Sequence, residues 1–166
     1  YSYMDRAPVQ PVDVRESLDD TLVMLRHRLA GGIEVVRDYA PELPRVEANG
    51  GELAQVWTNL IANAIDAMDG RGTLEVRTRR GGEDDVVIEI TDSGPGIPPE
   101  IRSRIFDPFF TTKPAGAGSG LGLHIAHNIV VNRHCGRLEV ESVPGRTTFR
   151  IVVPVSLSTR TAVSGV

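Results

Sequence analysis

Three short motifs, far apart along a chain of 166 residues, restrict most strongly what this sequence can fold into. They are Asn59-Leu-Ile-Ala-Asn63-Ala, Asp92-Ser-Gly-Pro-Gly96 and Gly118-Ser-Gly-Leu-Gly122-Leu, in that order. An amide on a helix can ligate a hard cation through oxygen, a carboxylate at a strand end can accept hydrogen bonds, and glycines at a helix start can admit an anion to backbone N–H groups. Together the motifs predict one site built from three segments.

The composition excludes several classes of function. Hydrophobic residues make up 40% of the chain, which is enough for one domain with its own core. The formal net charge of −4 argues against a broad basic surface, so we expect no binding of nucleic acid and no contact with a membrane. A single cysteine, Cys135, and the lack of an apolar run of about 20 residues favour a cytoplasmic protein.

The chain divides into three parts. Residues 1–12 contain Pro8 and Pro11 and are typical of a linker, residues 13–155 are expected to form one domain, and residues 156–166 form a polar tail. Because the chain opens without a methionine, we expect it to be a piece of a longer protein.

Helical and strand patterns are interleaved within the expected domain. The predicted helices are residues 13–30, with Asp13 and Glu16 as a capping pair, 52–68 and 120–134. The predicted strands are a short one that begins with Ile33 and is ended by Ala40-Pro41, and residues 73–79, 86–91, 137–142 and 147–154. Helices interleaved with antiparallel hairpins favour an α+β fold, a two-layer sandwich with the helices on one face of the sheet.

A Pro- and Gly-rich stretch over residues 93–119 is far longer than a usual connection. It contains one short helical candidate, residues 99–105, and three of the four phenylalanines of the chain. Long loops of this kind often cover a binding site, so we expect a lid here.

The motif residues also allow simpler interpretations when each is taken alone. Asn59 and Asn63 lie one helical turn apart, so both amides project from one face, either as a pair of ligands or as polar groups satisfied within a core. Asp92 is either a carboxylate presented at a sheet edge or the first residue of a turn.

The combination of motifs resembles the N, G1, F and G2 boxes of the GHKL family. The F box corresponds to residues 105–113, Ile-Phe-Asp-Pro-Phe-Phe-Thr-Thr-Lys. The resemblance covers residues 13–155, and the most similar branch is the catalytic ATP-binding domain of bacterial sensor histidine kinases. It implies the Bergerat fold, in which a mixed, mainly antiparallel sheet carries helices on one face and a long ATP lid. A Walker A loop is excluded, because no Gly-Lys-Ser/Thr follows the glycines.

The resemblance assigns roles at the phosphate end of an ATP site, and the predicted catalytic residues are Asn59, Asn63 and Lys113. Asn63 is expected to hold Mg²⁺. Asn59 stands where ATP-hydrolysing relatives have Glu, and an amide accepts no proton at neutral pH, so we expect slow intrinsic hydrolysis. Asp66 stands where many histidine kinases have Lys, so we expect a solvated surface carboxylate there and Lys113 as the replacement cation.

At the other end, Asp92 is expected to accept a hydrogen bond from the adenine amino group, and Phe106 to anchor the lid to the core. Residues 144–148 shorten the closing loop of the family, from which Thr147 or Thr148 is expected to reach the adenine edge through water. The residues predicted to contact the nucleotide are Asn59, Asn63, Asp92, Gly94, Gly96, Ile97, Thr111, Thr112, Lys113, Gly118, Ser119, Gly120, Leu121, Gly122, Leu123 and Thr148.

None of the four histidines stands in a phosphoacceptor signature, and each is expected on the surface or on a helix face. The resemblance therefore implies a module that binds Mg²⁺ and ATP and donates the γ-phosphoryl group to a His of a helical dimerisation domain missing upstream of residues 1–12. A response regulator receiver domain is the indirect partner. Two alternatives stay open, namely a regulatory nucleotide-binding module without transfer activity and an anti-sigma serine kinase of the same fold.

Overall fold

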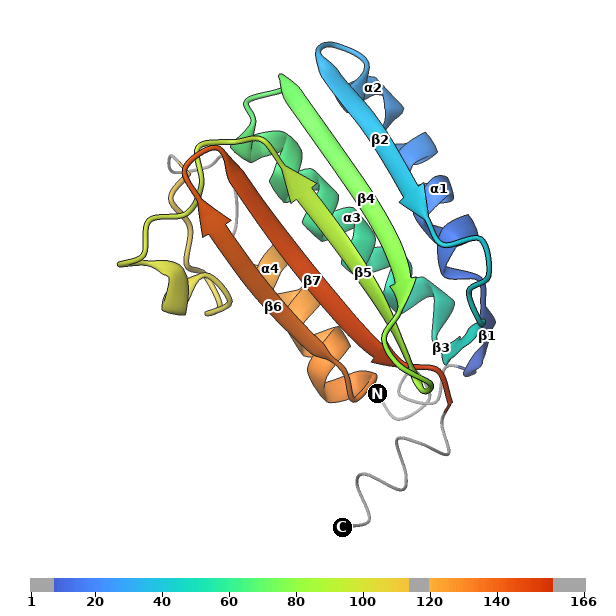
Figure 1. The fold of residues 1–166 in the computed structure, drawn as a ribbon. Coiled ribbons are helices and arrows are strands. Elements are labelled where there is room, and N and C mark those ends of the chain that lie inside the picture. Colours follow the sequence, from blue (N-terminus) through green and yellow to red (C-terminus); the bar gives the residue numbers. More distant parts are fainter. Residues whose placement is uncertain (1–7, 114–119, 157–166) are drawn as a thin grey trace.

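The computed structural model describes residues 8–113 and 120–156, and within them helices cover one face of a five-stranded sheet (Figure 1). The strands of this sheet are β2 (Ile33–Tyr39), β4 (Gly72–Arg80), β5 (Asp85–Asp92), β6 (Arg137–Val143) and β7 (Arg146–Pro154). Their order across the sheet is β2-β4-β5-β7-β6. β2 runs parallel to β4 and the other neighbouring pairs are antiparallel, so the predicted mixed, mainly antiparallel sheet is confirmed.

The helices of the described residues are α1 (Val14–Met24), α2 (Arg26–Leu29), α3 (Gly50–Ala67) and α4 (Gly122–Asn128), with a 3₁₀ turn η2 (Arg102–Arg104) and a π-helix η3 (Ile129–Arg133) that continues α4. The side chain of Asp13 caps α1 as predicted. The first predicted helix is wrong in one respect, because Leu25 leaves helical geometry and divides it into α1 and α2. The third begins later than predicted, at Gly122, since the φ of +74° at Gly120 does not fit a right-handed helix.

A second sheet of two strands joins the N-terminal part of the described chain to the domain. The strands β1 (Gln10–Val12) and β3 (Val46–Ala48) pair antiparallel, with Val12 opposite Val46. Residues 10–12, expected to lie in a linker, are therefore part of the fold. Residues 1–7 of that expected linker and residues 157–166 of the expected tail lie outside the described residues.

The core lies between the large sheet and α3. Alternate strand residues such as Leu74, Ile90 and Phe149 face the helices and are buried. Trp57 on α3 has no exposed surface, and its Nε1 donates a hydrogen bond to Ser17 Oγ on α1 at 3.0 Å. Full burial of one such large apolar side chain stabilises the fold by about 1.5–3 kcal/mol, so this layer fixes the position of α3 on the sheet.

His134 is part of the core, which corrects the expectation of a surface position. It is only 1% exposed. Its Nε2 accepts a hydrogen bond from the backbone N–H of Asn49, the N-cap of α3, and its Nδ1 lies 3.0 Å from the carbonyl oxygen of Ile129. The ring therefore ties the start of α3 to the end of α4.

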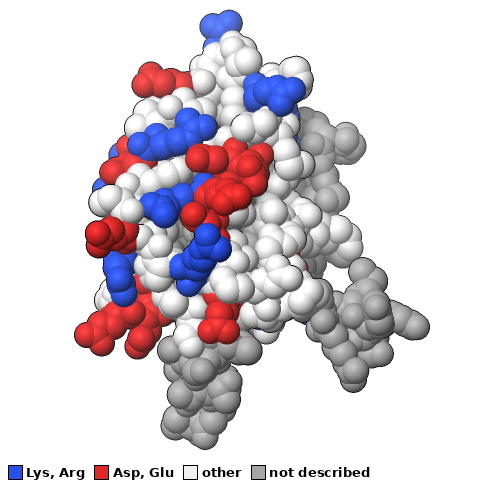
Figure 2. Space-filling view, turned by 90° about the vertical axis from the view of Figure 1, so that its right-hand side faces the viewer, with Lys and Arg blue, Asp and Glu red and all other residues white. Residues whose placement is uncertain are grey.

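The charged surface shows both signs in alternation. Figure 2 displays Lys and Arg interspersed with Asp and Glu, without a broad basic area on the face in view. Ion pairs account for part of this pattern, for example Arg37 with Asp19 at 2.9 Å and Arg77 with Asp38 at 3.3 Å. Among the described helices, none has the length and hydrophobicity that crossing a membrane requires.

Candidate functional site

Helix α3 is the element on which the predicted motifs meet. Near its middle, the side-chain Nδ2 of Asn59 donates a hydrogen bond to the carbonyl oxygen of Gly122 at 3.0 Å, which brings the start of α4 against α3. At its C-terminal end, a Cβ added to Gly94 would lie 3.0 Å from the carbonyl oxygen of Ala67. The fold thus brings described residues of the second and third motifs against the helix that carries the first.

Asp92 is a buried carboxylate at the end of β5. It is 2% exposed, and its Oδ1 accepts a hydrogen bond from the backbone N–H of Gly94 at 2.9 Å. Burial raises the pKa of Asp92, and the Gly94 hydrogen bond opposes this effect only in part. Within the described residues, the other oxygen, Oδ2, has no hydrogen-bond partner, so one acceptor of this carboxylate remains available beside the hollow that Asp92 lines.

Strand register decides which threonine accompanies Asp92. Thr147 of β7 lies directly opposite Asp92, so both side chains belong to the helix-covered face of the sheet. Thr148 lies opposite Thr91 on the other face, and the two hydroxyls are 2.8 Å apart. Successive strand residues point to opposite faces, so Thr148 is not brought to Asp92 and that site prediction is wrong. Thr147, the other candidate of the closing loop, takes its place.

A short polar chain links Thr147 to the loop that follows Asp92. The hydroxyls of Thr147 and Ser142 lie 2.7 Å apart, and Ser142 Oγ accepts a hydrogen bond from the backbone N–H of Ile97 at 2.7 Å. In this loop the backbone at Gly96 passes close to β6. Gly96 has a φ of +92°, and a Cβ on it would lie 2.6 Å from the carbonyl oxygen of Val143. Ser142 was not expected at the site, and its position on the strand before the closing loop is the only signal for it in the sequence.

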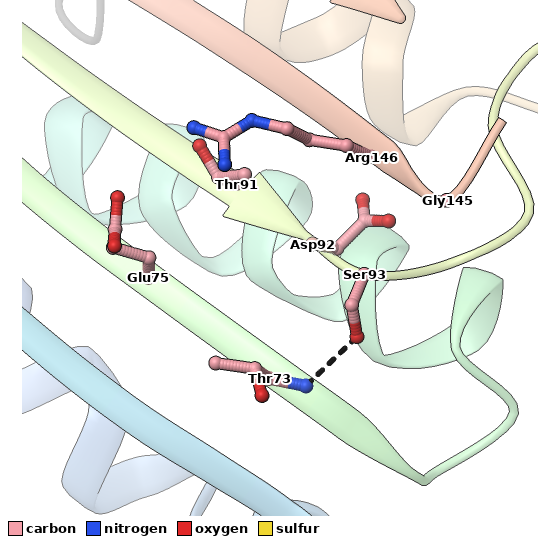
Figure 3. Close-up of a pocket in the computed structure, with 7 residues that line it drawn as sticks. All are labelled: Thr73, Glu75, Thr91, Asp92, Ser93, Gly145 and Arg146. Atoms are coloured by element: carbon pink, nitrogen blue, oxygen red, sulfur yellow. Dashed lines mark hydrogen bonds between the residues drawn. The ribbon is translucent and has the colours of Figure 1, made fainter. Parts of the chain in front are cut away.

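A small hollow of about 130 Å³ opens where the start of β4, the end of β5 and the start of β7 meet (Figure 3). Glu75 and Thr91 lie opposite each other on β4 and β5, on the face away from the helices, and contribute to this hollow together with Arg146. Ser93 also lines it and accepts a hydrogen bond from the backbone N–H of Thr73 at 2.9 Å. Asp92 and Gly145 line the hollow as well, so Asp92 borders both this hollow and the helix-covered face of the sheet.

The two asparagines of the first motif differ in whether their side-chain amides form hydrogen bonds within the described residues. Asn59 is engaged at both ends, because its Oδ1 also accepts a hydrogen bond from Gln55 Nε2 at 2.7 Å. Asn63 is half-buried, and no described residue forms a hydrogen bond with its side chain. With respect to residues 8–113 and 120–156, the oxygen of Asn63 is thus available to ligate a cation, whereas Asn59 joins α3 to α4.

Phe106 attaches the segment of residues 105–113 to the core, as predicted. Its ring lies 6.2 Å from the ring of Phe149 and 5.0 Å from that of His127, measured between centroids. Its carbonyl oxygen lies 3.2 Å from His124 Nδ1 on α4. The middle of the expected lid is therefore held in place by packing and by one polar contact.

The end of this segment is joined to the start of α4. The backbone N–H of Phe109 donates to the carbonyl oxygen of Gly120 at 2.8 Å, and a Cβ on Gly120 would lie 2.5 Å from the carbonyl carbon of Phe109. Leu121 and Leu123 follow, half-buried, at the beginning of α4. The predicted contacts Gly118 and Ser119, with the rest of residues 114–119, lie outside the described residues.

Lys113 is paired with the carboxylate of Asp66. Its Nζ lies 2.5 Å from Asp66 Oδ2, and Arg28 Nη2 lies 2.6 Å from Asp66 Oδ1. Asp66 is exposed, as expected of a surface carboxylate, and the structure adds two cations that contact it. Thr111 and Thr112 are exposed beside Lys113, and Thr111 Oγ1 accepts a hydrogen bond from the Lys113 backbone N–H.

Comparison with known proteins agrees with this geometry. Residues 48–157 match the family model described as histidine kinase-, DNA gyrase B- and HSP90-like ATPase. The chain belongs to this ATPase family. The match includes α3, the strand end with Asp92 and the start of α4, so the resemblance stated from the motifs is confirmed.

The ATPase domain is similar to sensor histidine kinases. It is 37% identical over 160 residues to the sensory histidine kinase/phosphatase NtrB of Rhodobacter capsulatus, covering 89% of this chain and 44% of NtrB. The chain therefore spans less than half the length of that relative.

Solved structures show the same fold. The nucleotide-free catalytic domain of the histidine kinase ThkA is 30% identical, with a TM-score of 0.79 and coverage of 88% of this chain and 97% of that one. ThkA has also been solved in complex with the response regulator protein TrrA. Full-length ShkA in complex with AMPPNP is 27% identical, with a TM-score of 0.80 and coverage of 89% of this chain and 31% of that one. The α+β, GHKL-type fold is thereby confirmed.

Proposed function

We propose that this ATPase domain binds Mg-ATP between α3, the end of β5 and the start of α4, and donates the γ-phosphoryl group to a His of a separate helical domain. The observation that carries the proposal is the buried Asp92 carboxylate, which stands at one end of α3, while the Asn63 amide, to which no described residue forms a hydrogen bond, stands further along the same helix. A purine and a polyphosphate need these two kinds of group at the two ends of one site.

Asp92 would recognise the adenine base. Its Oδ2 would accept a hydrogen bond from the exocyclic amino group, and a charged acceptor makes such a bond stronger than a neutral one. The hydroxyl pair of Thr147 and Ser142 offers a polar edge beside it. Gly94 and Gly96 keep side chains away from the ring, which lets the backbone approach it closely.

Asn63 would hold Mg²⁺ by its amide oxygen, with the phosphates and water as the remaining ligands, because Mg²⁺ keeps several waters and binds few protein groups. The available Asn63 oxygen fits this role. Bound Mg²⁺ would neutralise charge on the β- and γ-phosphates. Thr111, Thr112 and Lys113 would donate hydrogen bonds to phosphate oxygens, as would the backbone N–H groups of Gly122 and Leu123.

Asn59 would restrict the loss of ATP to water. Its amide accepts no proton at neutral pH, and both of its ends are engaged with protein groups. Without a general base at this position, a bound water is a poor nucleophile, and the γ-phosphoryl group is retained for transfer.

In the transfer step, an imidazole nitrogen of the acceptor His would form a bond to the γ-phosphorus while the bond to the β–γ bridging oxygen breaks, and ADP leaves. The histidines of this chain are poor candidates for that acceptor. His134 is buried with both ring nitrogens in contact with backbone groups, and His124 and His127 contact Phe106. His27 is exposed but stands in no phosphoacceptor signature, so the proposal assigns the acceptor to another domain of the longer protein.

The expected partners are the His-bearing dimerisation domain of the same protein and, after it, the receiver domain of a response regulator. The ThkA complex with TrrA supports the second partner, and the ShkA complex with AMPPNP, an ATP analogue, supports the nucleotide. A cytoplasmic location follows from the proposal, because ATP is available there.

The test is transfer of label from ATP carrying a radioactive γ-phosphate. We expect the chain alone to stay unlabelled and an added His-bearing helical domain of the same protein to become labelled in an acid-labile form. Stable labelling of this chain would contradict the division of roles. ATP binding without transfer to the added domain would instead identify a regulatory nucleotide-binding module.

A further inference from the structure

Asp66 joins three elements of the fold through two ion pairs. Arg28 of α2 contacts its Oδ1 at 2.6 Å, and Lys113 contacts its Oδ2 at 2.5 Å. The side chains are partly exposed, at 44% for Arg28, 33% for Asp66 and 35% for Lys113. Solvent can thus reach the cluster, and so can a ligand.

The cluster lies beside the phosphate end of the site. Asp66 follows Asn63 by three residues on α3, so the two side chains project from the same side of that helix. A bare carboxylate next to a polyphosphate would repel it. With Arg28 and Lys113 included, the formal charge of the cluster is +1 (two cations and one anion), which equals the charge of a single lysine.

We propose that Arg28 is a positioning residue for nucleotide binding, because it neutralises Asp66 and allows Lys113 to exchange from that carboxylate to a phosphate oxygen. This inference rests on the proposed function and deepens it. Without Arg28, Lys113 would be the one remaining cation of the described residues that pairs with Asp66, so its movement to the nucleotide would leave an uncompensated negative charge beside the phosphates.

If Arg28 acts in this way, its loss should weaken nucleotide binding without lowering the stability of the fold. Partly exposed ion pairs contribute little to stability, so the loss of Arg28 should change the thermal midpoint of unfolding very little. The same loss changes the local charge from +1 to 0, which acts on a polyphosphate and leaves an uncharged ligand unaffected.

The experiment is calorimetric titration with a Mg²⁺-bound ATP analogue at low salt, using wild type, Arg28→Ala, Arg28→Gln, Asp66→Asn and the double variant Arg28→Ala/Asp66→Asn. Arg28→Gln keeps the aliphatic stem in case Arg28→Ala disturbs packing. Arg37→Ala is the matched control, since Arg37 also forms a partly exposed pair, with Asp19 at 2.9 Å.

We expect the two Arg28 variants to bind the analogue about three- to tenfold more weakly than wild type, with the difference shrinking at high salt. The double variant should return to within about twofold of wild type, because loss of the Asp66 carboxylate restores the formal charge of the cluster to +1. Affinity for adenosine should be the same in all variants, and Arg37→Ala should match wild type.

Two results would overturn the inference while leaving the site itself intact. One is unchanged affinity in both Arg28 variants, and the other is a double variant as weak as Arg28→Ala, which would mean that Arg28 does not act through Asp66. Failure of the wild type to bind the analogue is a different outcome, because it would overturn the proposed function and this role of Arg28 with it.

Discussion

Asp92 and Thr147 lie directly opposite each other on β5 and β7, and both are buried on the face of the sheet that the helices cover. This pairing places a carboxylate and a hydroxyl side by side at the proposed adenine end of the site. The same register sends Thr148 to the opposite face, where it contacts Thr91.

The register gives a test with a built-in control. Thr147→Val removes the hydroxyl that faces Ser142 and Asp92, so we expect adenosine to bind more weakly by about 0.5–1.5 kcal/mol, the net value of a neutral hydrogen bond. Thr148→Val removes only the contact with Thr91 and should bind adenosine like wild type. Equal losses in both variants, measured by titration, would contradict the assignment.

The charge of Asp92 should matter as much as its position. Asp92→Asn keeps the shape of the side chain and replaces a charged acceptor, so we expect affinity for an ATP analogue to fall by about 1.5–3 kcal/mol in calorimetric titration. Unchanged affinity would remove Asp92 from the site. A second purine nucleotide without the exocyclic amino group provides the control, because its affinity should depend less on this substitution.

The raised pKa of Asp92 predicts a pH dependence of binding. Protonation turns the acceptor into a donor, so adenosine affinity should fall as pH decreases toward the pKa of Asp92, at a higher pH than for an ordinary Asp. Adenosine is the suitable ligand because it has no phosphate that titrates. Asp92→Asn should abolish the dependence, and an identical pH profile in both proteins would contradict it.

The same pKa shift predicts how Asp92 affects stability. A carboxyl group whose folded-state pKa is raised stabilises the fold most below its unfolded pKa, and this contribution is lost as pH rises through the folded pKa. We therefore expect the free energy of unfolding of the wild type, relative to Asp92→Asn, to be lower at pH 7 than at pH 4. Urea unfolding at both pH values measures this difference.

Two glycines with positive φ separate backbone strain from steric contact. Gly96→Ala would combine a φ of +92° with a Cβ 2.6 Å from the Val143 carbonyl oxygen, whereas Gly145→Ala would have a φ of +89° and no neighbour within 4 Å. We expect Gly145→Ala to lower the free energy of unfolding by about 1 kcal/mol and Gly96→Ala by about 2 kcal/mol or more. Equal losses in urea unfolding would argue against the close approach at Gly96.

His134 should be important for stability. His134→Leu leaves the N–H of Asn49 and the carbonyl of Ile129 without this partner, which should lower the free energy of unfolding by about 1–3 kcal/mol. The exposed His27 is the control, and His27→Ala should stay within about 0.5 kcal/mol of wild type. A mild effect at His134 would show that the ring is dispensable for joining α3 to α4.

Local patterns in the sequence were sufficient for most of the fold. Strands such as β4 and β6 alternate apolar and polar residues, and α3 repeats apolar residues at helical spacing, so each of these elements carries its own signal. The strands β1 and β3 carry no such signal, since each is three residues long and is stabilised by a partner far away in the chain. The break at Leu25 was hidden for a similar reason, because the apolar spacing continues across it.

What the sequence by itself determined is the fold class, the motif order and the types of group at the proposed site, because these depend on short-range periodicity and on residue chemistry. Tertiary structure alone decided that Thr147 faces Asp92, that His134 is buried, and that Asp66 is compensated by Arg28 and Lys113. Each of these facts depends on strand register or on contacts between distant segments. Such contacts form only when the helices pack on the sheet, so no local pattern records them.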